Sequence, residues 1–222
     1  MSPRLVIFDC DGVLVDSEPI SNGVLADMLA EHDVAMTLAE SRERFQGRLL
    51  VEIPVLVQEE FGVELPEGWL ALYEQRRAEV FRRELAPVPG APELVGAVLE
   101  AGLSACVASQ GRLSKTDLSL ALTGLERLFP VTARFSAEQV ARGKPHPDLF
   151  LYAAEVMGVA PEDCVVVEDT PSGVQAAVAA GMPVYGYCAD SDEQALRAAG
   201  ATTVESLFEL PLLLVGSPLR EG

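Results

Sequence analysis

The chain has 222 residues, enough to bury a substantial core, and 49% of them are apolar while 23% are charged. Its formal net charge of −18 argues against general binding to nucleic acid or to an anionic membrane surface. No apolar run is long enough to cross a membrane, and the N-terminus lacks the pattern of a signal peptide. We therefore expect a cytoplasmic protein that has neither nucleic acid nor membrane among its partners.

The first predicted element is the apolar run LVIF at residues 5–8. Its continuous apolar character is typical of a strand in a parallel sheet that is covered on both faces. Asp9 and Asp11 follow at its carboxyl end, and Gly12 permits an unusual backbone path. In an extended chain, residues two apart point the same way, so the two carboxylates would repel each other. The pattern therefore predicts a cation or a shared proton between them.

Residues 17–86 carry the spacing of apolar residues that is typical of amphipathic helices. Helices are predicted over residues 21–34, 49–63 and 67–86. Pro54 is expected to kink or open the second of these helices, and Gly62 to end it. Because this helical block falls between the first strand and the remaining ones, we interpret it as an inserted cap.

After the turn-rich PVPGAP at residues 87–92, strands and helices alternate. The predicted strands are residues 103–109, 163–169 and 182–188, and the predicted helices are 114–125, 146–158, 171–181 and 191–200. This alternation is typical of a parallel sheet with helices on both faces. We therefore predict an α/β protein, with a Rossmann-like parallel sheet core at 1–16 and 87–222 and a helical-bundle cap at 17–86.

The four cysteines are scattered along the chain, without any Cys-x-x-Cys pair. They are Cys10, Cys106, Cys164 and Cys188, and three of them lie in apolar, strand-like surroundings. We interpret them as buried free thiols in a reducing compartment rather than as disulfides or zinc ligands.

Polar residues gather at the predicted strand ends and in one adjoining loop: Asp9, Asp11, Ser109, Gln110, Lys144, Glu168 and Asp169. Singly, each has an ordinary explanation, such as a helix cap, a solvated loop or a favourable helix dipole. Parallel α/β sheets bind ligands outside the carboxyl ends of their strands, so these residues are expected to meet. Carboxylates suit Mg²⁺, and helix-start amides suit phosphate. Together they predict a magnesium- and phosphate-binding site.

Four motifs, DCDGVLVDSE, VASQG, GKPHPDLFLYAAE and VVVEDTPSGVQAAVAAGM, carry a family resemblance over essentially the whole chain. In this order they resemble the haloacid dehalogenase-like (HAD) hydrolase superfamily. The similarity is greatest to its branch of helical-cap sugar-phosphate phosphatases and β-phosphoglucomutases. The segments RFQG and YGYCAD also resemble bacterial members of the 6-phosphogluconate phosphatase type.

The resemblance implies roles for the two aspartates. Asp9 would attack phosphorus and form an aspartyl-phosphate, and an ordinary carboxyl pKa of about 4 would leave it ionised at neutral pH. Asp11 would protonate the leaving alkoxide and then activate the water that hydrolyses the intermediate. Mg²⁺ would be held by the Asp9 side chain, the Asp11 carbonyl and Asp169, with Glu168 contributing directly or through water.

The same resemblance implies that Lys144 neutralises charge on Asp9 and on the phosphate, while Ser109 and Gln110 hold phosphate oxygens.

In the cap, Gln46, Gly47 and Arg48 would contact the rest of the substrate. Arg48 could bind a sugar-acid carboxylate with both ends of its guanidinium group, although a plain surface arginine fits the sequence equally well.

Three alternatives fit the sequence less well than a phosphatase does. Dehalogenases of the superfamily lack the second aspartate, so Asp11 argues against them. Family mutases usually carry a histidine shortly after the first motif and a lysine in the cap, whereas this chain has Ser21 and no cap lysine. A catalytically inactive binding protein would have lost motif acids that are all present here. We therefore expect a Mg²⁺-dependent phosphomonoester hydrolase, monomeric by default, that acts on small phosphorylated metabolites such as sugar or sugar-acid phosphates.

Overall fold

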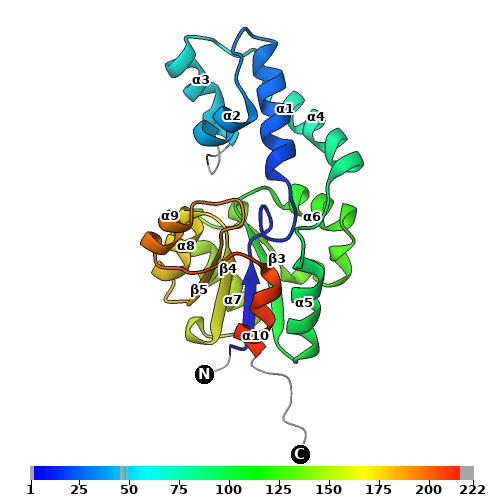
Figure 1. Ribbon diagram of the computed structural model, residues 1–222, viewed down its shortest axis with the longest axis vertical. Coiled ribbons are helices and arrows are strands. Elements are labelled where there is room, and N and C mark those ends of the chain that lie inside the picture. The colour runs from blue at the N-terminus through cyan, green and yellow to red at the C-terminus, as the bar shows by residue number, and fades with distance from the viewer. Residues whose placement is uncertain (1–2, 46–47, 49, 216–222) are drawn as a thin grey trace, which may run out of the picture. The chain divides into compact units, whose positions relative to one another are not determined.

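The chain folds into two compact units (Figure 1), one formed by Met1–Val15 with Pro87–Gly222 and the other by Asp16–Ala86. The computed structural model describes residues 3–45, 48 and 50–215. The first unit contains the sheet, and the second is helical. Within the described residues, no helix combines the length and apolar character that crossing a membrane requires.

A six-stranded sheet with the order β3-β2-β1-β4-β5-β6 forms the centre of the first unit. Its strands are β1 (Leu5–Phe8), β2 (Ser104–Ser109), β3 (Arg134–Ser136), β4 (Cys164–Glu168), β5 (Val184–Tyr187) and β6 (Thr202–Val204). All neighbouring strands run parallel. Because β2 and β4 flank β1 on opposite sides, the direction of chain progression reverses at β1. The carboxyl end of β1 is therefore the point where such sheets bind ligands.

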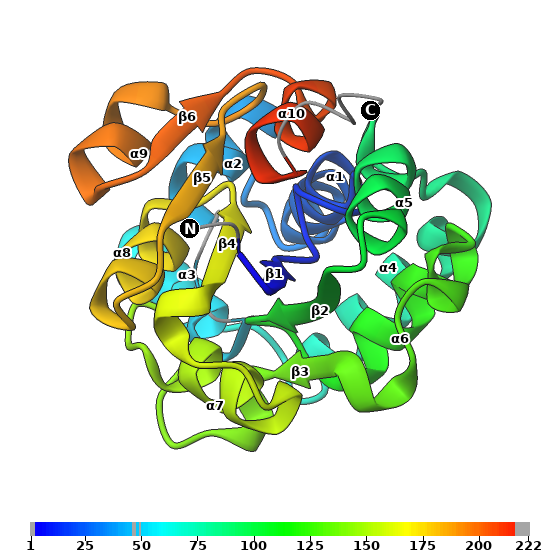
Figure 2. The ribbon, with the colours of Figure 1, turned by 90° about the horizontal axis from the view of Figure 1, so that it is seen from below.

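Helices cover both faces of this sheet, as the view along the strands shows (Figure 2). They are α5 (Ala91–Glu100), α6 (Leu113–Leu122), α7 (Asp148–Met157), α8 (Pro171–Ala179), α9 (Glu193–Ala199) and α10 (Leu210–Val215). Helices α7 and α8 lie on one side of the sheet, and α5 and α10 on the other. Double coverage explains why β1 is apolar at every position instead of alternating.

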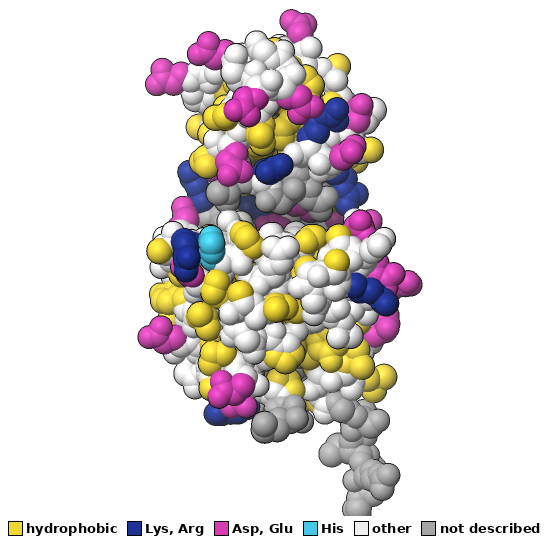
Figure 3. All heavy atoms as spheres, turned by 90° about the vertical axis from the view of Figure 1, so that its left-hand side faces the viewer, with side chains coloured by type: hydrophobic (Ala, Val, Ile, Leu, Met, Phe, Trp, Pro, Cys, Tyr) yellow, Lys and Arg dark blue, Asp and Glu magenta, His cyan; other side chains and the backbone are white. Residues whose placement is uncertain are grey.

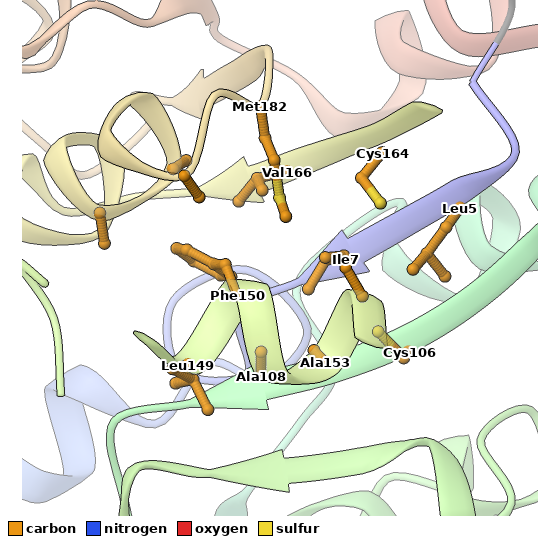
Figure 4. Packing of buried hydrophobic residues seen from close by; sticks show 14 of the residues in the cluster. Leu5, Ile7, Cys106, Ala108, Leu149, Phe150, Ala153, Cys164, Val166 and Met182 are labelled. Atoms are coloured by element: carbon orange, nitrogen blue, oxygen red, sulfur yellow. The ribbon is translucent and has the colours of Figure 1, made fainter. Parts of the chain in front are cut away.

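One hydrophobic core cluster of the first unit lies between the sheet and helices α7 and α8 (Figure 4). Ile7 stands opposite Cys106 on β2 and Val166 on β4, and Phe150 reaches this layer from α7. Each large apolar side chain buried here contributes about 1.5–3 kcal/mol to the free energy of unfolding. All four cysteines are free thiols, and only Cys188 is partly exposed.

The second unit has a hydrophobic core of its own. Its helices are α1 (Glu18–Ala30), α2 (Leu38–Phe45), α3 (Ile53–Phe61) and α4 (Trp69–Glu84). Helix α1 packs against α2 and α4. Trp69 and Tyr73 stack with ring centroids 5.9 Å apart in the buried cluster, alongside Leu29 and Phe45.

The α/β fold class and four of the strands are confirmed, and short elements account for the differences. Sequence patterns did not indicate β3 and β6, which have three residues each, or helices α2, α5 and α10. Pro54 lies in the first turn of α3 and therefore opens that helix instead of kinking it. Gly62 ends the same helix with φ 69°, as predicted. The remaining bounds differ by a few residues.

Candidate active site

The loop after β1 places two aspartates at the carboxyl edge of the sheet. The Asp9 amide donates to the Val167 carbonyl at 2.9 Å, so Asp9 continues the pairing of β1 with β4. The chain then turns sharply, because the amides of Leu14 and Val15 both donate to the Cys10 carbonyl at 3.0 Å. Asp9 is 6% exposed. This local structure fixes the backbone on either side of both carboxylates.

Gly12 allows Asp169 to pack against this loop. Gly12 has φ 81°, and a side-chain carbon added to it would overlap the Asp169 carboxylate and lie 2.8 Å from its Cγ atom. Asp169 follows β4 and is buried. The absence of a side chain at position 12 therefore serves two purposes, the left-handed backbone and the close approach of the Asp169 carboxylate.

Lys144 joins the ends of β1 and β4. Its ammonium group forms ion pairs with Asp9 Oδ1 and Glu168 Oε1, and its side chain is only 3% exposed. The ammonium nitrogen also lies 5.0 Å from the centroid of the Phe150 ring, which is within the range of cation–π attraction. The Lys144 amide donates to Gln110 Oε1 at 2.9 Å. Lys144 is thus held at both its backbone and its charged end.

Glu168 uses both carboxylate oxygens on groups of the protein. Oε1 accepts from Lys144, and Oε2 accepts from the Asp169 amide (3.0 Å), the Thr170 amide (3.0 Å) and the Thr170 hydroxyl (2.9 Å). Thr170 in turn caps α8 by accepting from the Gly173 amide at 3.1 Å. A side-chain carbon on Gly173 would overlap the Glu168 carboxyl group. This packing holds Glu168 against the first turn of α8.

The protonation behaviour of the site follows from its burial. Burial raises the pKa of the Asp9 carboxyl to about 7; Lys144 opposes this shift, and the nearby Glu168 and Asp11 carboxylates add to it. The ordinary pKa expected from the sequence left out this desolvation. Burial alone would lower the pKa of Lys144, but Asp9 and Glu168 outweigh it and raise that pKa above its usual value. Burial also raises the pKa of the Cys10 thiol, so that thiol stays protonated.

The end of β2 faces the second aspartate. The buried Ser109 hydroxyl lies 3.5 Å from Asp11 Oδ2 and accepts from the Gly111 amide at 3.0 Å. The Ser136 hydroxyl donates to the Gly111 carbonyl at 2.7 Å, which ties the loop to β3. Lys115, in the first turn of α6, forms an ion pair with Asp11 Oδ1. The structure therefore adds a second lysine to this edge of the sheet.

The seven core residues singled out in the sequence all lie at this edge: Asp9, Asp11, Ser109, Gln110, Lys144, Glu168 and Asp169. Of the three cap residues, Arg48 is exposed in the second unit, and Gln46 and Gly47 lie outside the described residues. Sequence reasoning missed Lys115, although it is one of only two lysines in the chain.

The donor atoms at this edge suit a hard cation. Asp9 and Asp169 offer carboxylate oxygens, and the Asp11 carbonyl belongs to the loop against which Asp169 packs. Within the described ranges, no cluster of three or more His, Cys, Asp or Glu side chains is placed to hold a metal. Mg²⁺ does not need such a cluster, since it commonly takes one or two carboxylates and keeps several waters. The residues present therefore fit Mg²⁺.

This chain is similar to known proteins in both its sequence and its fold. The family model for haloacid dehalogenase-like hydrolases matches residues 3–181. The 6-phosphogluconate phosphatase of Escherichia coli (strain K12) is 35% identical over 209 residues, covering 94% of this chain and 93% of that protein. The phosphorylated carbohydrates phosphatase of Thermotoga maritima is 30% identical, covering 90% and 92%. A HAD family hydrolase from Deinococcus radiodurans R1, solved with bound phosphate and sodium, aligns with a TM-score of 0.82 at 31% identity, covering 96% of each chain.

The chain therefore belongs to the haloacid dehalogenase-like hydrolase family. Within that family it is a phosphatase, and proteins similar to it include those named 6-phosphogluconate phosphatase, hexitol phosphatase A and putative β-phosphoglucomutase.

Proposed function

We propose that this protein hydrolyses phosphomonoesters with the help of Mg²⁺, through a phosphoryl group carried transiently on Asp9. One observation carries the proposal: the Asp9 carboxylate lies buried at the carboxyl end of β1, next to the ammonium of Lys144 and two residues before Asp11. One edge of the sheet thereby supplies a nucleophile, a cation that can also pair with a phosphate, and a second carboxyl group.

In this mechanism an Asp9 oxygen attacks phosphorus, and the bond between phosphorus and the leaving oxygen breaks. Asp11 gives a proton to that oxygen. In the second step water attacks the phosphoryl group, the bond to Asp9 breaks, and Asp11 takes the proton of the water. Ser109 and the backbone amide of Gln110 would hold the other phosphate oxygens, and Lys144 would balance their charge.

Mg²⁺ held by Asp9, Asp169 and the Asp11 carbonyl would supply the positive charge that lets an anionic nucleophile approach an anionic phosphate. Glu168 has a different role in this proposal. Because both of its oxygens already accept from protein donors, we assign it to anchoring Lys144 rather than to binding the metal directly.

We further propose that the substrates are small sugar or sugar-acid phosphates. The similarity to enzymes named 6-phosphogluconate phosphatase and phosphorylated carbohydrates phosphatase supports this class. The unit of residues 17–86 would act as the cap, with Gln46, Gly47 and Arg48 selecting the non-phosphate part. A monomer in the cytoplasm remains part of the proposal, and the free thiols are consistent with a reducing compartment.

The experiment is a phosphate-release assay with and without Mg²⁺ on 6-phosphogluconate, hexose and pentose phosphates, phosphoglycolate and glycerol phosphates. We expect metal-dependent release that Asp9→Asn abolishes. Unchanged release in Asp9→Asn would overturn the nucleophile assignment. Conversion of glucose 1-phosphate to glucose 6-phosphate without free phosphate would show a mutase instead.

A further inference from the structure

The chain contains only two lysines, and each forms an ion pair with one of the two aspartates that follow β1. Lys144 contacts Asp9, and Lys115 contacts Asp11. The other 14 of the 16 basic residues are arginines, and none of them takes part in these two ion pairs. The mechanism above gives Lys144 a role and leaves Lys115 without one.

Lys115 lies where a lysine does not favour its own helix. It is the third residue of α6, which begins at Leu113. The start of a helix carries partial positive charge, so a cation there is unfavourable. The contact with Asp11 offsets this cost. A residue that conflicts with its local structure and is compensated by a site residue points to a role in that site.

The surroundings keep this pair partly shielded from water. The Lys115 and Asp11 side chains are 16% and 18% exposed. Gly111 lies beside the pair, since a side-chain carbon there would be in ordinary van der Waals contact with Lys115 Cδ and Ser109 Oγ, at 3.4 Å from each. Screening by solvent and salt is therefore weaker here than for a surface pair.

The negative charge at this edge of the sheet makes the positive charge of Lys115 important for phosphate binding. When a phosphate group is bound, the two lysines and the proposed Mg²⁺ are the cations at this edge. They face the phosphate, the carboxyl groups of Asp9, Glu168 and Asp169 and, once it has given up its proton, the Asp11 carboxylate. Without Lys115, this edge would hold one positive charge fewer beside Asp11 and the phosphate.

We propose that Lys115 is the counter-charge of Asp11 and that it is required for tight binding of a phosphate group beside Asp9 and Asp11. It acts through Asp11 and is a positioning residue, not a catalytic one. This inference rests on the proposed function, since it assumes that the phosphate binds at this edge.

The test is binding of inorganic phosphate, measured by titration calorimetry with Mg²⁺ present, which needs no turnover. Lys115→Met is expected to raise the Kd for phosphate about tenfold, because a unit charge a few ångströms away is lost from a partly shielded site. Lys115→Arg keeps the charge and should restore most of the affinity. Arg4→Met is the matched control, since Arg4 pairs with Asp163 at the opposite end of β1 and is exposed; its Kd should match the wild type.

A double-mutant cycle then separates action through Asp11 from a purely structural role. In an Asp11→Asn background, Lys115→Met should change the Kd less than twofold, because the Asp11 carboxylate with which Lys115 pairs is absent. An equal loss in both backgrounds, or no loss in Lys115→Met alone, overturns the inference on Lys115. A wild-type protein that binds no phosphate contradicts the proposed function as well, so the two failures are distinguishable.

Discussion

The ion pairs at the carboxyl edge of the sheet and those in the helical unit differ in burial. At the carboxyl edge of the sheet, Lys144 is 3% exposed and sits between Asp9 and Glu168. In the helical unit, ion pairs such as Arg44–Glu60, at 2.8 Å, lie at the surface with side chains 32% and 46% exposed. Figure 3 likewise shows acidic and basic side chains on the surface of that unit.

This difference in burial determines how much the free energy of unfolding falls when one partner of an ion pair is removed. Removing one partner of a buried pair leaves an uncompensated charge and typically costs about 3–5 kcal/mol. Removing one partner of an exposed pair typically costs between about 0 and 1 kcal/mol. Substitutions at the sheet edge should therefore have large, shared effects, and substitutions in the helical unit small, separate ones.

The largest effect is expected from Lys144→Met. Asp9 and Glu168 would then be buried side by side without a cation, so the free energy of unfolding should fall by about 3–5 kcal/mol. Denaturant unfolding with EDTA present measures this change, and phosphate release should be lost as well. Arg44→Met in the helical unit is the comparison, and it should leave the free energy of unfolding nearly unchanged because the Arg44–Glu60 pair is exposed. Equal costs in the two variants would remove the distinction between the units.

Two glycines of the first unit, one next to the site and one away from it, allow a second comparison between tightly packed and open positions. In Gly173→Ala the new methyl would overlap the Glu168 carboxyl group, and such overpacking typically costs about 1–3 kcal/mol. Displacing Glu168 should also disturb Lys144 and lower kcat.

Gly96, in the middle of α5, is the matched control because a side-chain carbon there meets nothing within 4 Å. Gly96→Ala should be neutral or raise the free energy of unfolding by up to about 1 kcal/mol through helix propensity. Thermal unfolding and phosphate release of both variants give the answer. A Gly173→Ala protein as stable and active as Gly96→Ala would contradict the tight packing.

Most residues at the carboxyl edge of the sheet could be predicted from the sequence, because the strands that place them there have strongly apolar patterns. The apolar run of β1 identifies the strand, and parallel topology then brings its carboxyl end close to those of β2 and β4. The contact of Lys115 with Asp11 could not be predicted, since it depends on how the first turn of α6 is oriented. The three-residue strands β3 and β6 are too short to show a pattern.

The role of Glu168 was equally beyond the sequence. An adjacent Glu168 and Asp169 suggest two metal ligands, and only the structure shows that Glu168 accepts from Lys144 and from the start of α8. The raised pKa of Asp9 belongs to the same category, because its largest cause is burial, which neighbours along the chain do not reveal.

Metal dependence should distinguish the two adjacent acids at the end of β4, Glu168 and Asp169. Asp169→Asn should raise the Mg²⁺ concentration for half-maximal phosphate release at least tenfold, since a proposed ligand is lost. Glu168→Gln should lower kcat while changing that concentration only about threefold or less, because its oxygens are occupied by Lys144 and the start of α8. An equal shift in both variants would contradict the assignment of Glu168 to anchoring Lys144 rather than to binding the metal.

The smallest effect is expected in the helical unit, from Arg48→Ala. Substitutions of exposed side chains usually change the free energy of unfolding by less than about 0.5 kcal/mol, so the variant should fold normally. If Arg48 pairs with a sugar-acid carboxylate, the KM for 6-phosphogluconate should rise about three- to tenfold with kcat unchanged, because a bidentate charged contact is lost. The KM for glucose 6-phosphate, which has no carboxylate, should stay the same, and Arg44→Ala should change neither KM. An equal rise in KM for both substrates would mean that Arg48 does not recognise the acid group.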